Sequence, residues 1–157
     1  MRVIAGRWGG RRLQAPPGRS TRPTSDRVRE ALFSVLGDRV VGARVLDLFA
    51  GSGALGLEAL GLGPAEAEVR HAEALVALQS ARRRSEKYDL VFIDPPYDRA
   101  QGLEPRLAEL LPPLLGPGAR VVVESDRRAP LRLALPLQRE RVYGDTAIRI
   151  HRSNEPT

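Results

Sequence analysis

The sequence contains no cysteine and no long apolar run. Without cysteine, a disulfide framework, a cysteine-ligated zinc or iron–sulfur site and a thiol nucleophile are all excluded. No window reaches the roughly eighteen consecutive apolar residues that a membrane-spanning helix needs, so no membrane partner is expected. The opening residues also lack the apolar stretch of a secretory signal, and we therefore expect a cytoplasmic protein.

Lysine and aromatic side chains are scarce. Lys87 is the one lysine among 25 basic residues, and aromatic residues make up 4% of the chain. Apolar residues, by contrast, make up 42% of the 157 positions, which excludes a disordered chain and suits one folded domain. There is no internal repeat.

Positive charge is concentrated in the N-terminal part of the sequence. Residues 1–30 contain eight arginines and two acidic residues, so this segment accounts for the whole net charge of +6. A preference for arginine over lysine is typical of GC-rich coding sequences, but that bias does not explain why the excess lies in one segment. A localised basic segment favours a polyanionic partner, above all nucleic acid.

Local patterns predict a hairpin and a helix in this basic segment. Residues 2–13 have the alternation and the central glycines of a small hairpin. A helix should follow, capped by Thr24 or Ser25 and ended by Gly37. Its apolar stripe would comprise Val28, Leu32, Val35 and Leu36.

The rest of the sequence alternates strands and helices as in an α/β domain. Predicted strands are 44–49, 68–72, 89–93 and 119–124, and predicted helices are 53–60, 75–84 and 104–111. An antiparallel pair, 137–143 with 146–152, would complete the sheet. The predicted organisation is a basic extension at 1–42, a domain at 43–152 and a frayed tail at 153–157.

The first candidate site is a glycine turn between a strand and a helix. Gly51, Gly53 and Gly56 form G-x-G-x-x-G in VLDLFAGSGALG, where glycines allow a sharp turn and a close approach to a ligand. Asp47 lies four residues before the first of them, inside an apolar strand, where a carboxylate needs a partner. That partner is either a local backbone amide or a ligand with a cationic or hydroxyl group. The amino-acid end of S-adenosylmethionine fits the second alternative.

The second candidate site is Asp94-Pro95-Pro96-Tyr97, directly after the apolar strand predicted at 89–93. Open α/β sheets bind ligands at the carboxyl ends of their strands. The two prolines have no N–H to donate, so the turn offers mainly acceptors, and an ionised Asp94 is an acceptor only. Tyr97 adds a flat ring for stacking. Acceptors beside an aromatic ring suit an exocyclic amino group on a planar base.

In this order, DLFAGSG and DPPY resemble the amino-group methyltransferases that use S-adenosylmethionine, whose fold is a Rossmann-like α/β sheet. MRVIAGRWGGRRL, TRPTSDRVREALFSVL and the closing VYGDTAIRIHR are similar to the bacterial 16S rRNA guanine-N2 methyltransferases of the RsmD type. The resemblance runs from Met1 to about Arg152. It implies methylation of the N2 amine of guanine 966 in 16S rRNA, within a small-subunit particle or as naked RNA, by a monomeric enzyme.

The resemblance also implies roles for individual residues. The guanine amine would donate hydrogen bonds to Asp94 and the Pro95 carbonyl, in a turn with Pro96, and the base would stack on Tyr97. Cofactor-binding residues would be Asp47, Phe49, Gly51, Ser52, Gly53 and Glu73. RNA-binding residues would be Arg2, Arg7, Arg11, Arg12, Arg22, Thr24 and Arg27, with the arginines of the hairpin on phosphates. No metal site is expected.

The sequence departs from this family between Gly53 and Asp94. The family has two strand–helix units there, whereas this sequence has room for one, a difference of roughly 30 residues. A deletion or an omitted segment would account for it. Glu73 then has two alternative roles: it lies near the adenine if 68–72 is the family's third strand, or binds the ribose if that strand takes the vacated second position.

Two other functions stay open beside the RNA guanine-N2 methyltransferase. An RNA-binding remnant with an impaired cofactor pocket is favoured by the loss of a whole unit. A DNA adenine-N6 methyltransferase shares the DPPY motif, but this sequence has no separate target-recognition region, which disfavours it.

Overall fold

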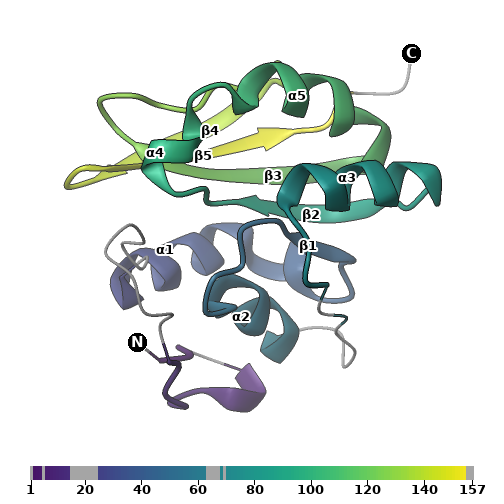
Figure 1. Ribbon diagram of the computed structural model, residues 1–157. Coiled ribbons are helices and arrows are strands. Elements are labelled where there is room, and N and C mark those ends of the chain that lie inside the picture. The colour runs from purple at the N-terminus through teal and green to yellow at the C-terminus, as the bar shows by residue number, and fades with distance from the viewer. Residues whose placement is uncertain (1, 5, 15–24, 63–67, 69, 155–157) are drawn as a thin grey trace.

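A computed structural model of the chain describes residues 2–4, 6–14, 25–62, 68 and 70–154, arranged as an α/β sandwich (Figure 1). One sheet lies between two layers of helices, which confirms the predicted fold class. No helix within these described ranges is long and apolar enough to cross a membrane.

The sheet has five strands in the order β1-β2-β3-β5-β4. They are β1 (Val45–Asp47), β2 (Tyr88–Ile93), β3 (Leu115–Asp126), β4 (Leu137–Tyr143) and β5 (Thr146–Arg152). The first three are parallel, and β5 joins β3 and β4 in antiparallel pairs. The β4–β5 hairpin has the predicted bounds, and β3 begins four residues earlier than predicted.

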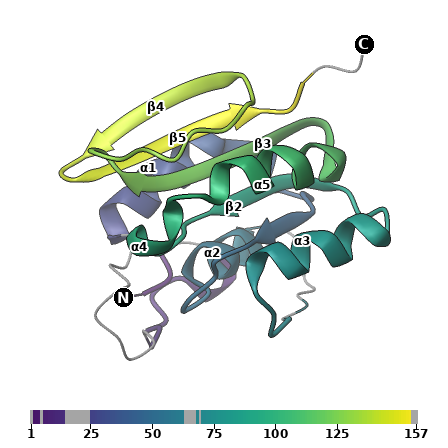
Figure 2. The ribbon, with the colours of Figure 1, turned by 45° about the horizontal axis from the view of Figure 1, so that its top comes forward.

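Helices cover both faces of this sheet (Figures 1 and 2). One face carries the short helix η1 (Gly6–Trp8), α1 (Asp26–Leu36), η2 (Gly37–Val40) and α2 (Ala54–Leu62). The other carries α3 (Ala74–Arg83), α4 (Tyr97–Ala100), α5 (Leu103–Leu110) and η3 (Pro112–Leu114). The helices α2, α3 and α5 start and end within two residues of their predicted bounds.

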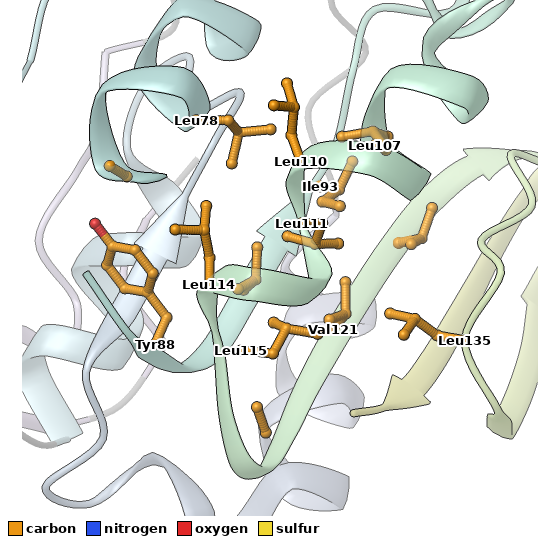
Figure 3. Close-up of a cluster of buried hydrophobic side chains, with 14 of the residues drawn as sticks. Leu78, Tyr88, Ile93, Leu107, Leu110, Leu111, Leu114, Leu115, Val121 and Leu135 are labelled. Carbon is orange, nitrogen blue, oxygen red and sulfur yellow. The ribbon is translucent and has the colours of Figure 1, made fainter. Parts of the chain in front are cut away.

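Each face of the sheet has its own apolar core because side chains alternate along a strand. Leu78 of α3 and Leu107 of α5 belong to a buried cluster with Ile93 and Val121 (Figure 3). On the opposite face, the rings of Phe33 and Phe92 lie 5.8 Å apart between centroids. The strand β2, which lies between β1 and β3, is buried on both faces, which explains the unbroken apolar run at its carboxyl end.

The signals at the two ends of α1 are confirmed. The Ser25 hydroxyl accepts a hydrogen bond from the Val28 amide at 3.3 Å, so Ser25 is the N-cap. Gly37 ends the helix with a φ of 53°. The predicted apolar stripe is wrong at Val35, which is 40% exposed, because Leu32, Phe33 and Leu36 already face the core.

The strand predicted at 68–72 is wrong: the described residues of that segment, 68 and 70–72, lie outside any strand. Arg70 pairs with Glu68 at 2.6 Å and with Glu86 at 3.1 Å, between nitrogen and oxygen atoms. These ion pairs hold the segment against the residues that follow α3. Among the described residues, β1 therefore pairs with β2 alone and is the outer strand of the sheet.

The described residues 2–14, which we name the N-terminal arm, fold back on themselves as predicted but form no regular strands. The Val3 amide donates to the Arg11 carbonyl at 2.9 Å, and the Gly10 amide donates to the Val3 carbonyl at 2.8 Å. A single antiparallel bridge joins Arg2 and Arg12, and η1 makes the turn. Val3 is buried, so the arm is attached to the core rather than projecting from it.

The predicted frayed tail is wrong at Ser153, its first residue. Ser153 is buried, and its amide donates to the Ala119 carbonyl at 2.9 Å, so it continues the pairing of β5 with β3. Residues 155–157 lie outside the described part of the chain.

Candidate active site

Two acidic residues stand at the carboxyl ends of neighbouring parallel strands. Asp47 is the last residue of β1 and lies opposite Phe92 in the register of β1 with β2. Asp94 follows two residues after Phe92, directly beyond the end of β2. Adjacent strands are about 4.8 Å apart, so this edge of the sheet brings the two predicted site residues together. Ligands bind at this edge in open α/β sheets.

The carboxyl group of Asp47 is only half satisfied by the protein. Its Oδ2 accepts a hydrogen bond from the Gly56 amide at 3.1 Å, so the local backbone partner considered from the sequence exists. Its Oδ1 is buried and has no hydrogen-bond partner. Burial raises the pKa of Asp47 to about 6, against a smaller lowering by the Gly56 amide. The second oxygen therefore keeps an acceptor position that the protein does not use.

The glycine turn between β1 and α2 needs its glycines for two different reasons. Gly51 and Gly53 have φ angles of 55° and 80°, which side chains with a Cβ rarely adopt. At Gly56 the constraint is contact instead, because a Cβ there would lie 3.3 Å from Oδ2 of Asp47 and the carboxylate would have to move by a few tenths of an ångström. The turn is closed by the Gly53 amide, which donates to the Ala50 carbonyl at 2.7 Å. The sequence signal G-x-G-x-x-G thus marks a shaped turn beside Asp47.

The DPPY residues lead from the end of β2 into α4, whose first residue is Tyr97; α4 is labelled in Figure 2. Pro95 is buried, and the Pro96 carbonyl accepts a hydrogen bond from the Arg99 amide at 2.9 Å, which fixes the turn. The Tyr97 hydroxyl lies 3.3 Å from Oγ1 of Thr146, the first residue of β5. This contact ties the candidate stacking ring to the β4–β5 hairpin.

The surroundings of Tyr97 are acidic. Burial raises the pKa of Tyr97 first, and the carboxylates of Glu124, Asp94 and Asp126 raise it further against the hydrogen bond with Thr146. Glu124 is buried near the end of β3, the strand next to β2. Sequence reasoning missed Glu124 and Thr146. An acid at the end of the apolar run 119–124 is the same signal that identified Asp47 and Asp94, and it could have identified Glu124.

The other predicted cofactor residues have mixed positions. Phe49 is half-buried and packs against the α3–α5 core, and Ser52 lies partly buried in the glycine turn. Glu73 is exposed at the N-terminal end of α3 and makes no capping hydrogen bond with its side chain. The structure thus places Glu73 on a helix terminus and not on a strand.

The predicted RNA-binding residues are exposed wherever they are described. Arg2, Arg7, Arg11 and Arg12 are exposed on the N-terminal arm, and Arg27 is exposed on α1. Arg22 and Thr24 lie outside the described residues.

Arg29 differs from the other arginines of the basic segment, because it is fully buried. Its guanidinium donates to the Arg2 carbonyl and to Asp26, and it lies 3.6 Å from the carboxylate of Glu58. One of the eight arginines of the segment therefore holds the fold together and is unavailable to a polyanion.

Comparisons with known proteins identify relatives of this chain. The family model described as Conserved hypothetical protein 95 matches residues 1–67 and 61–152. The Escherichia coli Ribosomal RNA small subunit methyltransferase D is 36% identical over 182 residues, covering 96% of this chain and 89% of that protein. The structure of a hypothetical protein from Thermus thermophilus has a TM-score of 0.80 and 29% identity, covering 96% of this chain and 98% of that one.

A more distant solved structure shows the fold class alone. It is the Thermus thermophilus 16S rRNA N2 G1207 methyltransferase in complex with AdoMet and guanosine, with a TM-score of 0.57 and 20% identity. The match covers 90% of this chain and 47% of that one.

The comparisons also locate the shortened part of the chain. The alignment with the Escherichia coli protein spans 182 residues although this chain has 157, so at least 25 positions of the relative have no counterpart here. The two matches to the family model meet at residues 61–67, where α2 ends. Relative to this family, the predicted absence of a segment between Gly53 and Asp94 is confirmed.

Proposed function

The chain belongs to the Conserved hypothetical protein 95 family, and we propose that it is an S-adenosylmethionine-dependent methyltransferase acting on the exocyclic N2 amine of a guanine in small-subunit rRNA. The observation that carries the proposal is the pairing of Asp47 and Asp94 at adjacent strand ends, with one buried oxygen of Asp47 left without a partner. The name of the Escherichia coli relative, a ribosomal RNA small subunit methyltransferase, supports the same substrate class.

The residues around the glycine turn fit the cofactor. S-adenosylmethionine carries an ammonium group at its amino-acid end, and Oδ1 of Asp47 is an acceptor without a protein partner. The turn at Gly51 and Gly53 brings backbone rather than side chains toward that position. When bound, this cofactor supplies an electrophilic methyl group on a sulfonium centre.

The DPPY turn fits a flat base with an amino group. Asp94 and the Pro95 carbonyl would accept hydrogen bonds from the amine, and Tyr97 would stack on the ring of a base taken out of its stack. A guanine amine is a weak nucleophile because its lone pair is delocalised into the ring. Holding that lone pair toward the methyl group is therefore the main contribution of these residues, and positioning of this kind contributes roughly 7–11 kcal/mol in favourable cases. The fixed acceptors also stabilise positive charge that develops on the nitrogen.

Calorimetry and a methylation assay test the proposal together. The purified chain is titrated with S-adenosylmethionine, then incubated with labelled cofactor and either 16S rRNA, small-subunit particles or DNA. Micromolar binding and label on N2 of guanine in RNA are expected. Label on DNA alone, or on another base position, would contradict it, and the comparison of RNA with particles identifies the true substrate.

An RNA-binding protein with an impaired cofactor pocket is the second candidate, and the outer position of β1 favours it. The family's additional strand–helix unit, including the acid that binds the ribose, is missing beside β1 among the described residues. A folded chain that binds RNA and gives no calorimetric signal with the cofactor would establish this alternative. If the cofactor binds, Glu73→Gln tests whether Glu73 replaces the missing acid, by a loss of affinity with the RNA affinity unchanged.

A further inference from the structure

A second basic surface lies on the sheet, away from the N-terminal arm. Ile148 and Ile150 of β5 face the core under α1, so by alternation Thr146 and Arg152 lie on that same face. Opposite them on β4, Arg141 pairs with Ile148 and Arg139 with Ile150. The outer strand thus presents two arginines beside α1.

A groove runs between α1 and β4 at this place. Its α1 side is formed by Ala31 and Val35, and its floor includes Ile148. Its β4 side is formed by Arg139, Arg141 and Tyr143. Both arginines are exposed, as is Val35. We name this feature the α1–β4 groove.

Beyond the groove, three more arginines extend the basic surface on this side of the sheet toward its opposite edge. Arg120 of β3 lies directly opposite Arg152 of β5, and Arg39 of η2 is close enough to act on Arg120 as well. The pKa of Arg120 is lowered, first by burial and then by repulsion from Arg39 and Arg152. Cations gathered in this way repel one another in the free protein and favour binding of a polyanion.

In the described part of the chain, carboxylates leave the arginines of β4 and η2 unpaired. Within the described ranges, no ion pair involves Arg39, Arg139 or Arg141. Glu140 of β4 pairs instead with Arg149, and both lie on the other face of the hairpin by alternation. Glu30 and Asp38, the acidic residues of α1 and η2 closest in sequence to Ala31 and Arg39, are exposed.

The groove leads to the candidate active site. Tyr143 and Thr146 form the last cross-strand pair at its end, and the Thr146 hydroxyl contacts the Tyr97 hydroxyl at 3.3 Å. The six steps from Thr146 to Arg152 span roughly 20 Å, enough for several nucleotides. An aromatic ring beside a basic track is typical of surfaces that bind a single strand of nucleic acid.

We propose that the α1–β4 groove binds the phosphate backbone of the rRNA strand that carries the target guanine, guiding it to Tyr97. This inference rests on the proposed function and adds to it a second RNA-binding surface, separate from the N-terminal arm. The groove contributes affinity and direction, whereas the choice of base is made at Asp94 and Tyr97.

The test compares two variants with the same change of charge. The groove variant is Arg139→Gln with Arg141→Gln, and the control is Arg83→Gln with Arg132→Gln, on α3 and beside α5 on the other side of the sheet. Binding of a 16S rRNA transcript is measured from low to moderate salt. Circular dichroism and cofactor titration establish that both variants are folded and keep the cofactor site.

For the groove variant, the slope of log affinity against log salt should fall by about 0.7 for each phosphate that the arginines no longer neutralise, and affinity near physiological salt by about tenfold. The control variant should keep the wild-type slope, and both should bind the cofactor as the wild type does. Equal slopes for the groove variant and the control would overturn the inference and leave the proposed function intact. Absence of salt-dependent RNA binding by the wild-type chain would instead overturn the proposed function.

Discussion

Asp47 shows how one residue can oppose stability and serve binding. Its carboxyl group is buried with one oxygen unpaired, and its pKa is raised from 3.8 to about 6. An acid whose pKa is higher in the folded state favours folding when protonated and opposes it when ionised. The buried carboxylate of Asp47 therefore lowers the free energy of unfolding by its full amount above about pH 6, where it is ionised, and does not lower it below pH 3.8.

We expect Asp47→Asn to stabilise the free protein above pH 6, by about 3 kcal/mol given that a shift of one pKa unit corresponds to about 1.4 kcal/mol. The gain should vanish toward pH 4, where Asp47 itself is protonated. The same variant should weaken binding of S-adenosylmethionine by about ten- to hundredfold, because it removes a charge-assisted hydrogen bond. Urea unfolding at several pH values and calorimetry measure the two effects, with Asp38→Asn as the surface control. If Asp47→Asn is less stable than the wild type at pH 8, the ionised Asp47 does not destabilise the fold and this prediction is wrong.

Asp94 should separate catalysis from cofactor binding. Its proposed partner is the guanine amine, so Asp94→Ala removes an acceptor that positions the nucleophile and leaves the glycine turn untouched. Methylation of rRNA should fall below detection while the dissociation constant for S-adenosylmethionine changes less than about twofold. Single-turnover assays and calorimetry on the same preparation measure both. Equal losses of binding and methylation would show that Asp94 belongs to the cofactor site.

The elements of the structure show which sequence signals were sufficient. The glycine turn, the DPPY turn and the hairpin were predicted because each depends on local residues: positive φ at Gly51 and Gly53, two adjacent prolines, and alternation around Gly144. The strand at 68–72 could not be predicted correctly in the same way. Its residues can adopt extended backbone, but a strand also needs a neighbour, and ion pairs with Glu86 hold the segment elsewhere.

Local sequence patterns also could not predict which charged side chains are buried and what they contact. Arg29 looked like one more cation of a basic segment, yet it is buried beside Glu58, which is itself buried in α2. Only the packing of the N-terminal arm against α1 and α2 explains this pair. The unpartnered oxygen of Asp47 likewise results from the placement of β1 against α2 and Gly56.

The N-terminal arm keeps its position because it packs against α2. Gly6 has a φ of 75°, and a Cβ there would lie 2.6 Å from the Gly61 carbonyl oxygen, a contact with backbone that cannot yield easily. Gly6→Ala should therefore displace the arm and weaken RNA binding several-fold, while the sheet and the helices that cover it stay folded. Gly10→Ala is the matched control, because its φ is 82° but nothing lies within 4 Å of the added Cβ. Filter binding and proteolysis of the arm measure the effect. If both variants behave identically, the loss of RNA binding is caused by backbone strain at the glycine and not by a lost contact between the arm and α2.

At the scale of the whole molecule, the two basic surfaces lie on opposite sides of α1. Arg29 faces the arm and Ala31 faces the α1–β4 groove, two residues apart and so about 200° around the helix. An rRNA substrate that contacts both surfaces must therefore cross α1. On its path it passes Arg27, which lies four residues before Ala31 and is therefore its neighbour on the helix surface. The arm and the groove then bind different phosphates of one RNA.

Separate phosphate contacts predict additive salt dependence. Arg11→Gln with Arg12→Gln should lower the slope of log affinity against log salt by about 0.7 to 0.9 per phosphate, as should the groove variant Arg139→Gln with Arg141→Gln. Since the two pairs share no partner in the described structure, the decrement of the fourfold variant should equal the sum of the two decrements. Titrations with one 16S rRNA transcript across a salt series measure all four proteins. A fourfold variant whose slope falls no further than that of either double variant would mean that the RNA uses one surface at a time, because only the surface in use can then contribute to the slope.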